Sequence, residues 1–198
     1  MNHGRRILST KYPFDSKFLR VVETTYQLDT EAATEQHTYF HVTRPNAKAI
    51  VAILLKTSDG KFILNKQYRM PIHTILIEPV AGLVGDKGDE DLEDAIQREC
   101  EEEVGYKPTE IVRLAPTEIV ASAGLSDETY HLFLGTGCEP IAKQDSGEAS
   151  EHGMETLLLT QEQLLQEFRN PSLVFADAKL AVLMWYYMLH TQSNPLAK

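Results

Sequence analysis

The chain has 198 residues, the length of one domain with an extension, and 42% of them are hydrophobic and 24% charged, as in an average globular protein. This composition excludes wholesale disorder, collagen-like repeats and a disulfide scaffold. The 19 Lys and Arg against 29 Asp and Glu give a formal charge of −10. The chain therefore lacks an overall positive field for a nucleic-acid backbone, and we expect no nucleic-acid partner.

The cysteines and the apolar runs indicate where the protein works. Cys100 and Cys138 are the only cysteines, too few for a disulfide framework or a thiolate zinc site, so we expect reduced thiols in a cytoplasmic protein. No apolar segment follows the two arginines near the N-terminus, so we expect no secretory signal. The longest apolar runs, residues 49–55 and 179–189, are shorter than the roughly 20 residues of a membrane span, so we expect no membrane partner.

The first predicted element is an N-terminal β-hairpin. Residues 18–28 and 37–43 are rich in β-branched and aromatic residues and are separated by a polar segment. The Arg-Pro-Asn of residues 44–46 marks a boundary, so we expect an extension over residues 1–45 and a domain over residues 46–198. A two-stranded hairpin that exposes aromatic residues is marginally stable alone, so we expect another surface to cover it.

The rest of the chain alternates between strand-like and helix-like patterns. Glycines mark a loop over residues 81–89, and a polar loop covers residues 143–153. This interleaving predicts an α/β fold with a mixed sheet. Strands are expected at residues 49–55, 61–67, 74–77, 111–114, 117–121, 129–134 and 155–159, and helices at residues 90–104, 161–168 and 176–189. An apolar stripe on the last helix should pack in the core or in a dimer, and comprises Ala181, Trp185, Met188 and Leu189.

The helix over residues 90–104 carries the densest group of carboxylates in the chain. Such a run is usually a solvated face. At about 100° per residue, however, Glu99 and Glu103 fall inside the apolar stripe around Leu92 and Ile96. These two side chains, one turn apart, should therefore point toward the protein body.

Two ionised carboxylates directed at the interior need a compensating charge. Arg98 is the only cation close in sequence, and the same helical geometry places it on the far side of the stripe. A hard divalent cation with oxygen ligands is the simplest solution, and Mg²⁺ is commonly held by a few carboxylates together with substrate phosphates. The residues alone therefore predict a carboxylate metal site at Glu99 and Glu103.

The same segment resembles the Nudix box, G-x5-E-x7-R-E-U-x-E-E-x-G-U with U apolar. From Glu90 onward the spacing matches, with the sequence RECEEEVGY at residues 98–106. One difference precedes the match, because seven residues instead of five separate Gly82 from Glu90. The resemblance identifies the chain as a Nudix hydrolase and implies an α/β/α sandwich with a mixed sheet. Arg98 would pair with Glu90 and tie the helix to the loop.

Further segments are similar to the ADP-ribose pyrophosphatase and nucleoside diphosphate-sugar hydrolase branch of that family. They are the Gln-Tyr-Arg of residues 67–69 and the Glu-Pro-Val-Ala-Gly of residues 78–82. The N-terminal hairpin is similar too, which implies an intertwined homodimer in which this extension also contacts substrate. The loop after the box reads Ser-Ala-Gly at residues 122–124, where the branch often has Ser-Pro-Gly, so the substrate stays open.

The resemblance implies how the site residues bind metal and substrate. Glu99 and Glu103 would bind Mg²⁺, for which Mn²⁺ can substitute. Glu102 would share or orient a second ion, and the backbone carbonyl of Ala81 would add an oxygen ligand. Arg69 would bind a substrate phosphate, the alternative being an ordinary surface arginine.

The catalytic base has three candidates. The family supplies a glutamate from the loop before the penultimate strand, here residues 143–153. Glu151 aligns best, Glu128 in the loop after the box comes second, and Glu148 comes third.

The implied reaction is hydrolysis of the pyrophosphate bond in a nucleoside diphosphate linked to another group. The best candidate is ADP-ribose, cleaved to AMP and ribose 5-phosphate, and the alternative is a nucleotide sugar such as GDP-mannose. A rival of another class is a Nudix-like protein that binds or regulates without catalysis. The intact set of Glu99, Glu102 and Glu103 argues against this rival.

Overall fold

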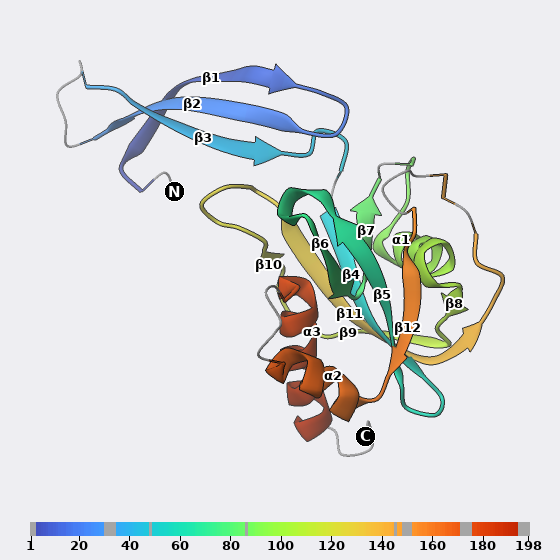
Figure 1. Cartoon of the computed structure of the whole chain (residues 1–198). Helices are drawn as coiled ribbons and strands as arrows, with labels where there is room; N and C mark the ends of the chain where they lie inside the picture. Colours follow the sequence, from blue (N-terminus) through green and yellow to red (C-terminus); the bar gives the residue numbers. More distant parts are fainter. Residues whose placement is uncertain are drawn as a thin grey trace.

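The computed structural model describes residues 3–29, 35–47, 49–85, 87–144, 146–147, 152–170 and 176–193. Within these ranges the strands form a three-stranded sheet near the N-terminus and a nine-stranded sheet in the rest of the chain (Figure 1). The small sheet lies beside the large one and is joined to it through the segment that follows its last strand (Figure 1).

The small sheet contains the predicted hairpin and one strand more. Strands β2 (Arg20–Leu28) and β3 (His37–Thr43) pair antiparallel, which confirms the hairpin, and β1 (Arg5–Asp15) pairs with the other edge of β2. Every residue of β1 is exposed, so its sequence lacks the alternation by which a half-buried strand is recognised. The backbone N–H of Val42 donates to the carbonyl oxygen of Leu125 at 2.8 Å and anchors this sheet to the body.

The large sheet is built around β4, whose central residues are all buried. Strand β4 pairs in parallel with β11 and antiparallel with β5 and β7. A strand covered on both faces reads as a continuous apolar run, which is the pattern that predicted it. The strands of this sheet are β4 (Ala49–Thr57), β5 (Phe62–Arg69), β6 (Thr74–Glu78), β7 (Val80–Val84), β8 (Tyr106–Lys107), β9 (Glu110–Arg113), β10 (Ile119–Val120), β11 (Thr129–Pro140) and β12 (Glu155–Leu159).

The first half of the expected loop over residues 81–89 is a strand, so that prediction was wrong. Strand β7 pairs with β4 along its whole length, with Ala81 opposite Ala52 and Leu83 opposite Ile50. The glycine in the middle of β7 suggested a loop, but pairing with a buried strand outweighs the low strand propensity of glycine. This pairing fixes the backbone around Ala81 against the protein core.

Helices cover both faces of the large sheet, which confirms the expected α/β/α arrangement (Figure 1). Helix α1 (Leu92–Glu99) packs on one face, and α2 (Gln161–Arg169) and α3 (Ala178–Ser193) pack on the other. Helix α1 begins at Asp91, whose carboxylate accepts the first free N–H groups, and continues into a π-helical turn, Cys100–Val104. It ends at Gly105, which has the left-handed conformation expected of a C-terminal glycine.

The predicted apolar stripe of α3 does not face the core. Trp185 is 58% exposed and Leu189 is 40% exposed. The helix is apolar on nearly every side, so the sequence gave no clear direction to its buried face. Packing in a dimer stays a prediction for this stripe. The residues that α3 buries in the core are Leu180, Leu183, Met184 and Tyr187. None of the helices in the described ranges combines the length and the apolar character needed to cross a bilayer.

Candidate active site

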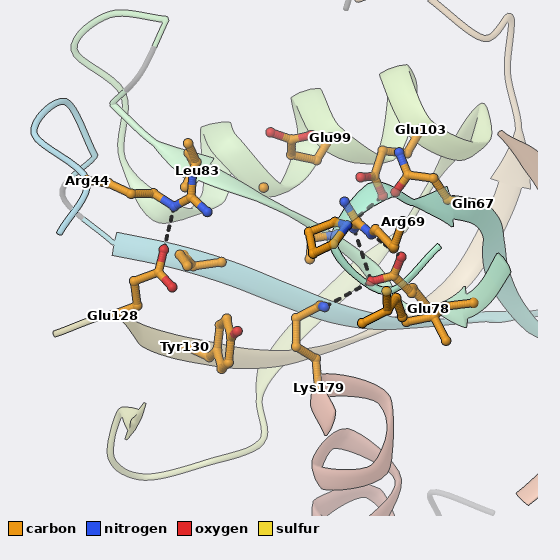
Figure 2. Close-up of a pocket in the computed structure, with 16 residues that line it drawn as sticks. Arg44, Gln67, Arg69, Glu78, Leu83, Glu99, Glu103, Glu128, Tyr130 and Lys179 are labelled. Carbon is orange, nitrogen blue, oxygen red and sulfur yellow. Dashed lines mark hydrogen bonds and ion pairs between the residues drawn. The ribbon is translucent and has the colours of Figure 1, made fainter. Parts of the chain in front are cut away.

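A cavity of about 450 Å³ lies between α1, the β5–β6 region and the start of α3 (Figure 2). Two acidic side chains of the box, Glu99 and Glu103, line one wall. The opposite wall carries Arg69, Glu78 and Lys179. The cavity therefore joins residues of the box to Arg69 and Glu78, which precede the box, and to Lys179, which lies more than 70 positions after it.

The two box carboxylates are buried, as the helical pattern predicted. Glu99 and Glu103 are each 6% exposed. The backbone of β7 passes directly beneath Glu99, because a Cβ atom added to Gly82 would lie 1.8 Å from Glu99 Oε1. Glycine at position 82 therefore makes the room that the Glu99 carboxylate occupies.

Glu103 ties the helix to two strands of the sheet. Its Oε2 accepts a hydrogen bond from Asn65 Nδ2 at 2.8 Å and another from the backbone N–H of Ala81 at 3.2 Å. Ala81 lines the same cavity. The carboxylate of Glu103 and the backbone of Ala81, both predicted metal ligands, thus lie side by side.

Arg98 connects the acidic groups of the box. Its guanidinium makes two hydrogen bonds with the Glu90 carboxylate, at 2.9 and 3.1 Å, which confirms the predicted pair. The same side chain also donates to Glu99 Oε1 at 2.6 Å and to Glu102 Oε2 at 3.2 Å. The expectation that Arg98 projects away from Glu99 was wrong, because its long side chain bends back across the helix.

The acidic group still lacks positive charge. Burial raises the pKa of Glu99 to about 7, although Arg98 opposes that shift. Glu102 has a second cationic partner, Lys87, at 2.8 Å. Among the described residues, Arg98 and Lys87 pair with Glu90, Glu99 and Glu102, and Arg69 interacts electrostatically with Glu103, so three cations accompany four carboxylates.

This donor set fits a hard divalent cation. Its ligands are all oxygen, and its carboxylates exceed its cations. Within the described ranges, no group of three or more acidic, histidine or cysteine side chains is arranged to hold a metal ion. In this structure the carboxylates of Glu99 and Glu102 are paired with Arg98 and Lys87.

Arg69, the predicted phosphate ligand, lines the cavity and forms a two-point ion pair. Its Nε and Nη2 donate to the two carboxylate oxygens of Glu78 at 2.6 and 3.0 Å. Lys179 donates to Glu78 as well, at 3.1 Å. Burial would raise the pKa of Glu78, but Arg69 and Lys179 outweigh it and hold this pKa below its ordinary value. Glu78 is therefore a buried anion that orients two cations.

Of the three candidate bases, one lies in the described part of the chain. Glu128 lines the cavity and forms an ion pair with Arg44, the residue that follows β3 (Figure 2). Glu151 and Glu148 lie outside the described residues.

Sequence reasoning missed Lys179 and Arg44 as cavity residues. Lys179 stands at the start of a helix assigned to packing, and Arg44 stands at a predicted boundary. No local motif surrounds either residue. Only the topology brings them to the box.

Comparisons with known proteins match most of the chain. A model of the NUDIX domain matches residues 45–176, a span that contains the whole acidic helix and most of the cavity wall. The chain belongs to the Nudix family. Its members generally use divalent metal ions, in keeping with the oxygen-rich wall of the cavity.

This Nudix hydrolase is similar in sequence to the following proteins. An ADP-ribose pyrophosphatase of Bacillus subtilis is 31% identical over 148 residues, 75% of each chain. A methanol dehydrogenase activator of Bacillus methanolicus is 29% identical over 150 residues, again 75% of each chain. An ADP-ribose pyrophosphatase of Saccharomyces cerevisiae is 41% identical over 70 residues, which cover 34% of this chain and 29% of the yeast protein.

The fold is also that of a solved ADP compounds hydrolase. The crystal structure of an ADP compounds hydrolase superposes with a TM-score of 0.78 and covers 96% of this chain and 95% of its own. The two sequences are 15% identical, so this likeness supports the fold.

Proposed function

We propose that this Nudix hydrolase catalyses the Mg²⁺-dependent hydrolysis of ADP-ribose to AMP and ribose 5-phosphate. The observation that carries the proposal is the cavity in which Glu99 and Glu103 of the box oppose Arg69. Carboxylates for a divalent cation on one side and a guanidinium fork on the other suit a pyrophosphate. The similarity to the ADP-ribose pyrophosphatase of Bacillus subtilis supports ADP-ribose over other nucleoside diphosphate derivatives.

The metal would be held by Glu99, Glu103 and the backbone carbonyl of Ala81, with Glu102 sharing or orienting a second ion. A bound Mg²⁺, or Mn²⁺ in its place, supplies charge neutralisation for the pyrophosphate and acidifies the attacking water. Gly82 keeps space for the Glu99 carboxylate, and Asn65 fixes the orientation of Glu103.

The remaining residues bind substrate and move the proton. Arg69, oriented by Glu78, would bind phosphate oxygens on the side of the cavity opposite the box. Water would add to phosphorus, the bond from phosphorus to the bridging oxygen would break, and a glutamate would take the proton of the water. For that glutamate we propose Glu151 first, Glu128 second and Glu148 third.

Replacing each of the three candidate bases by glutamine tests which one takes the proton. A general base contributes typically about 10²- to 10⁴-fold, so Glu151→Gln should lower kcat within that range and leave KM nearly unchanged. Glu148→Gln should cost less than about tenfold, which is below the general-base range. A crippled Glu128→Gln variant beside a nearly unaffected Glu151→Gln variant would assign the base to the loop after the box.

A substrate panel tests the reaction itself. ADP-ribose, GDP-mannose, UDP-glucose, NADH and diadenosine polyphosphates are compared with Mg²⁺, with Mn²⁺ and in excess EDTA. We expect ADP-ribose to have the highest kcat/KM and EDTA to abolish activity. Preference for GDP-mannose would establish the nucleotide-sugar alternative. Tight binding of a panel member without turnover would establish a binding or regulatory protein.

We propose that the chain works as a cytoplasmic homodimer whose extension, residues 1–45, provides the interface and substrate contacts for the domain of residues 46–198. Strand β1 supports this, because it is exposed along its whole length and carries Ile7, Tyr12 and Phe14, each more than half exposed. Light scattering at micromolar concentration should give the mass of a dimer, and a monomeric mass would contradict the proposal. Deletion of residues 1–44 should give aggregation or an inactive monomer.

A further inference from the structure

The wall of the cavity opposite the box contains two cations from distant parts of the chain. Arg69 comes from the end of β5, and Lys179 comes from the first turn of α3 (Figure 2). Arg69 Nη2 and Lys179 Nζ donate to the same oxygen, Glu78 Oε1, at 3.0 and 3.1 Å. The guanidinium and the ammonium therefore lie next to each other, and both line the cavity that Glu99 and Glu103 also line.

Asp177, two residues before Lys179, holds the Lys179 side chain in place. Asp177 accepts a hydrogen bond from Lys179 Nζ at 2.7 Å through one oxygen and from the backbone N–H of Leu180 at 2.8 Å through the other. The side chain of Lys179 is 14% exposed. Burial would lower the pKa of Lys179, but Asp177 and Glu78 raise it, so the ammonium stays charged at neutral pH. Holding a long, charged side chain in one orientation costs conformational entropy and desolvation, which this anchoring offsets.

In this wall the two cations, Arg69 and Lys179, balance the two carboxylates, Glu78 and Asp177, and the N-terminal end of α3 adds partial positive charge. Glu78 supplies one negative charge and holds two cations. The charge of Asp177 is shared with the positive N-terminal end of α3, because the same carboxylate caps Leu180. Within the described residues, the contacts of Lys179 occupy two of the three donors of its ammonium, those to Glu78 and Asp177.

We propose that Lys179 binds the pyrophosphate of the substrate beside Arg69. It would contact the side of the pyrophosphate that points away from the box. This inference rests on the proposed function and adds a substrate-binding residue to it. A bridged diphosphate carries negative charge on both phosphoryl groups. A cation held by the box neutralises one side, and a guanidinium fork beside an ammonium point charge neutralises the other. The alternative is that Lys179 serves only to neutralise the buried Glu78.

The test uses the full-length protein and the variants Lys179→Gln and Lys179→Arg. Glutamine keeps a hydrogen-bond donor for Glu78 but removes the charge, and arginine keeps the charge. The probe is α,β-methylene-ADP, a diphosphate that resists hydrolysis, and its Kd is measured by calorimetry in Mg²⁺. KM and kcat for ADP-ribose are measured in parallel. Lys61→Gln is the matched control, because Lys61 pairs with Asp59 in an exposed turn away from the cavity.

A hydrogen bond to a charged group accounts for about 1.5–3 kcal/mol, so Lys179→Gln should raise Kd and KM roughly ten- to hundredfold. Lys179→Arg should stay within about tenfold of wild type, and Lys61→Gln should match wild type. A Lys179→Gln variant with lower thermal stability but wild-type Kd and KM would overturn the proposal and leave Lys179 as a partner of Glu78. If Lys179→Gln fails to fold, a folded Lys179→Arg variant that has lost binding of the analogue overturns it as well.

The same data separate this inference from the proposed function. A wild-type protein that hydrolyses no panel member, yet binds the analogue through Lys179, would refute the hydrolase proposal and support the binding site. Hydrolysis of ADP-ribose with an unchanged KM in Lys179→Gln would do the reverse.

Discussion

Replacing Gly82 by alanine should separate catalysis from stability in this protein. The added Cβ would lie 1.8 Å from Oε1, 2.0 Å from Cδ and 2.5 Å from Cγ of Glu99. Carbon and oxygen atoms in ordinary contact are at least about 3.4 Å apart. The carboxylate of Glu99 must therefore move by roughly 1.5 Å, which breaks its hydrogen bond with Arg98. A displacement of about 1 Å at a catalytic group can cost about 10²-fold.

The backbone itself tolerates the change. Gly82 lies in a regular strand and does not have the left-handed conformation that would strain an alanine. In such a position, Gly→Ala stabilises by about 0.4–1 kcal/mol through the unfolded chain, which offsets part of the cost of displacing Glu99. We therefore expect a thermal midpoint close to that of wild type and a kcat/KM for ADP-ribose reduced about a hundredfold or more.

The matched control is Gly124→Ala, since a Cβ at position 124 meets nothing within 4 Å. Unfolding followed by circular dichroism and steady-state hydrolysis of ADP-ribose are measured for both variants. Gly124→Ala should match wild type in the unfolding assay. A Gly82→Ala variant as active as wild type would refute the reasoning, because it would show that the position of the Glu99 carboxylate does not matter to the reaction.

Three further predictions concern the box and the thiols. Glu103→Gln should lower kcat by several powers of ten. The variant should stay folded, because the amide oxygen can still accept a hydrogen bond from Asn65. Full activity of this variant, or full activity of the wild-type protein in excess EDTA, would contradict the metal site. Burial raises the folded-state pKa of Glu99 from 4.5 to about 7, so the metal-free protein should lose stability as the pH rises through this interval. Thermal midpoints measured in EDTA give the dependence of stability on pH, and this dependence should be weaker in Glu99→Gln. Burial raises the pKa of both thiols, that of Cys138 to about 11. A thiol reagent at pH 8 should therefore label neither Cys100 nor Cys138 until the chain unfolds. Rapid labelling of the native protein would contradict the burial of these two side chains.

The sequence predicted those elements whose pattern is dictated by burial. The core strand β4 and the inward direction of Glu99 and Glu103 follow from apolar runs and helical spacing, and both are confirmed. The strand β7 was missed because its glycine reflects the space needed by Glu99, a contact between segments that no local pattern reveals. The face that α3 buries in the core was not recognised, because almost every side of that helix is apolar.

The candidate site was predictable on one side only. The box places Glu90, Arg98, Glu99 and Glu103 at fixed spacing, so a single helix defines the acidic wall. The opposite wall is assembled by topology, and Lys179 reaches Glu78 from 101 positions along the chain. An ion pair of this kind leaves no periodic trace in the sequence.

The parallel pairing at the centre of the large sheet has a consequence for how the chain folds. Ile50 of β4 lies opposite Tyr130 of β11, so the central strand of the large sheet completes its pairing only after most of the chain has been synthesised. Pairings between distant segments fold slowly, because the entropy of closing the loop is lost before the contacts form. During that interval the apolar strand β4 can associate with other chains. Expression at low temperature, or together with a chaperone, should therefore raise the yield of native protein more than changes to its surface.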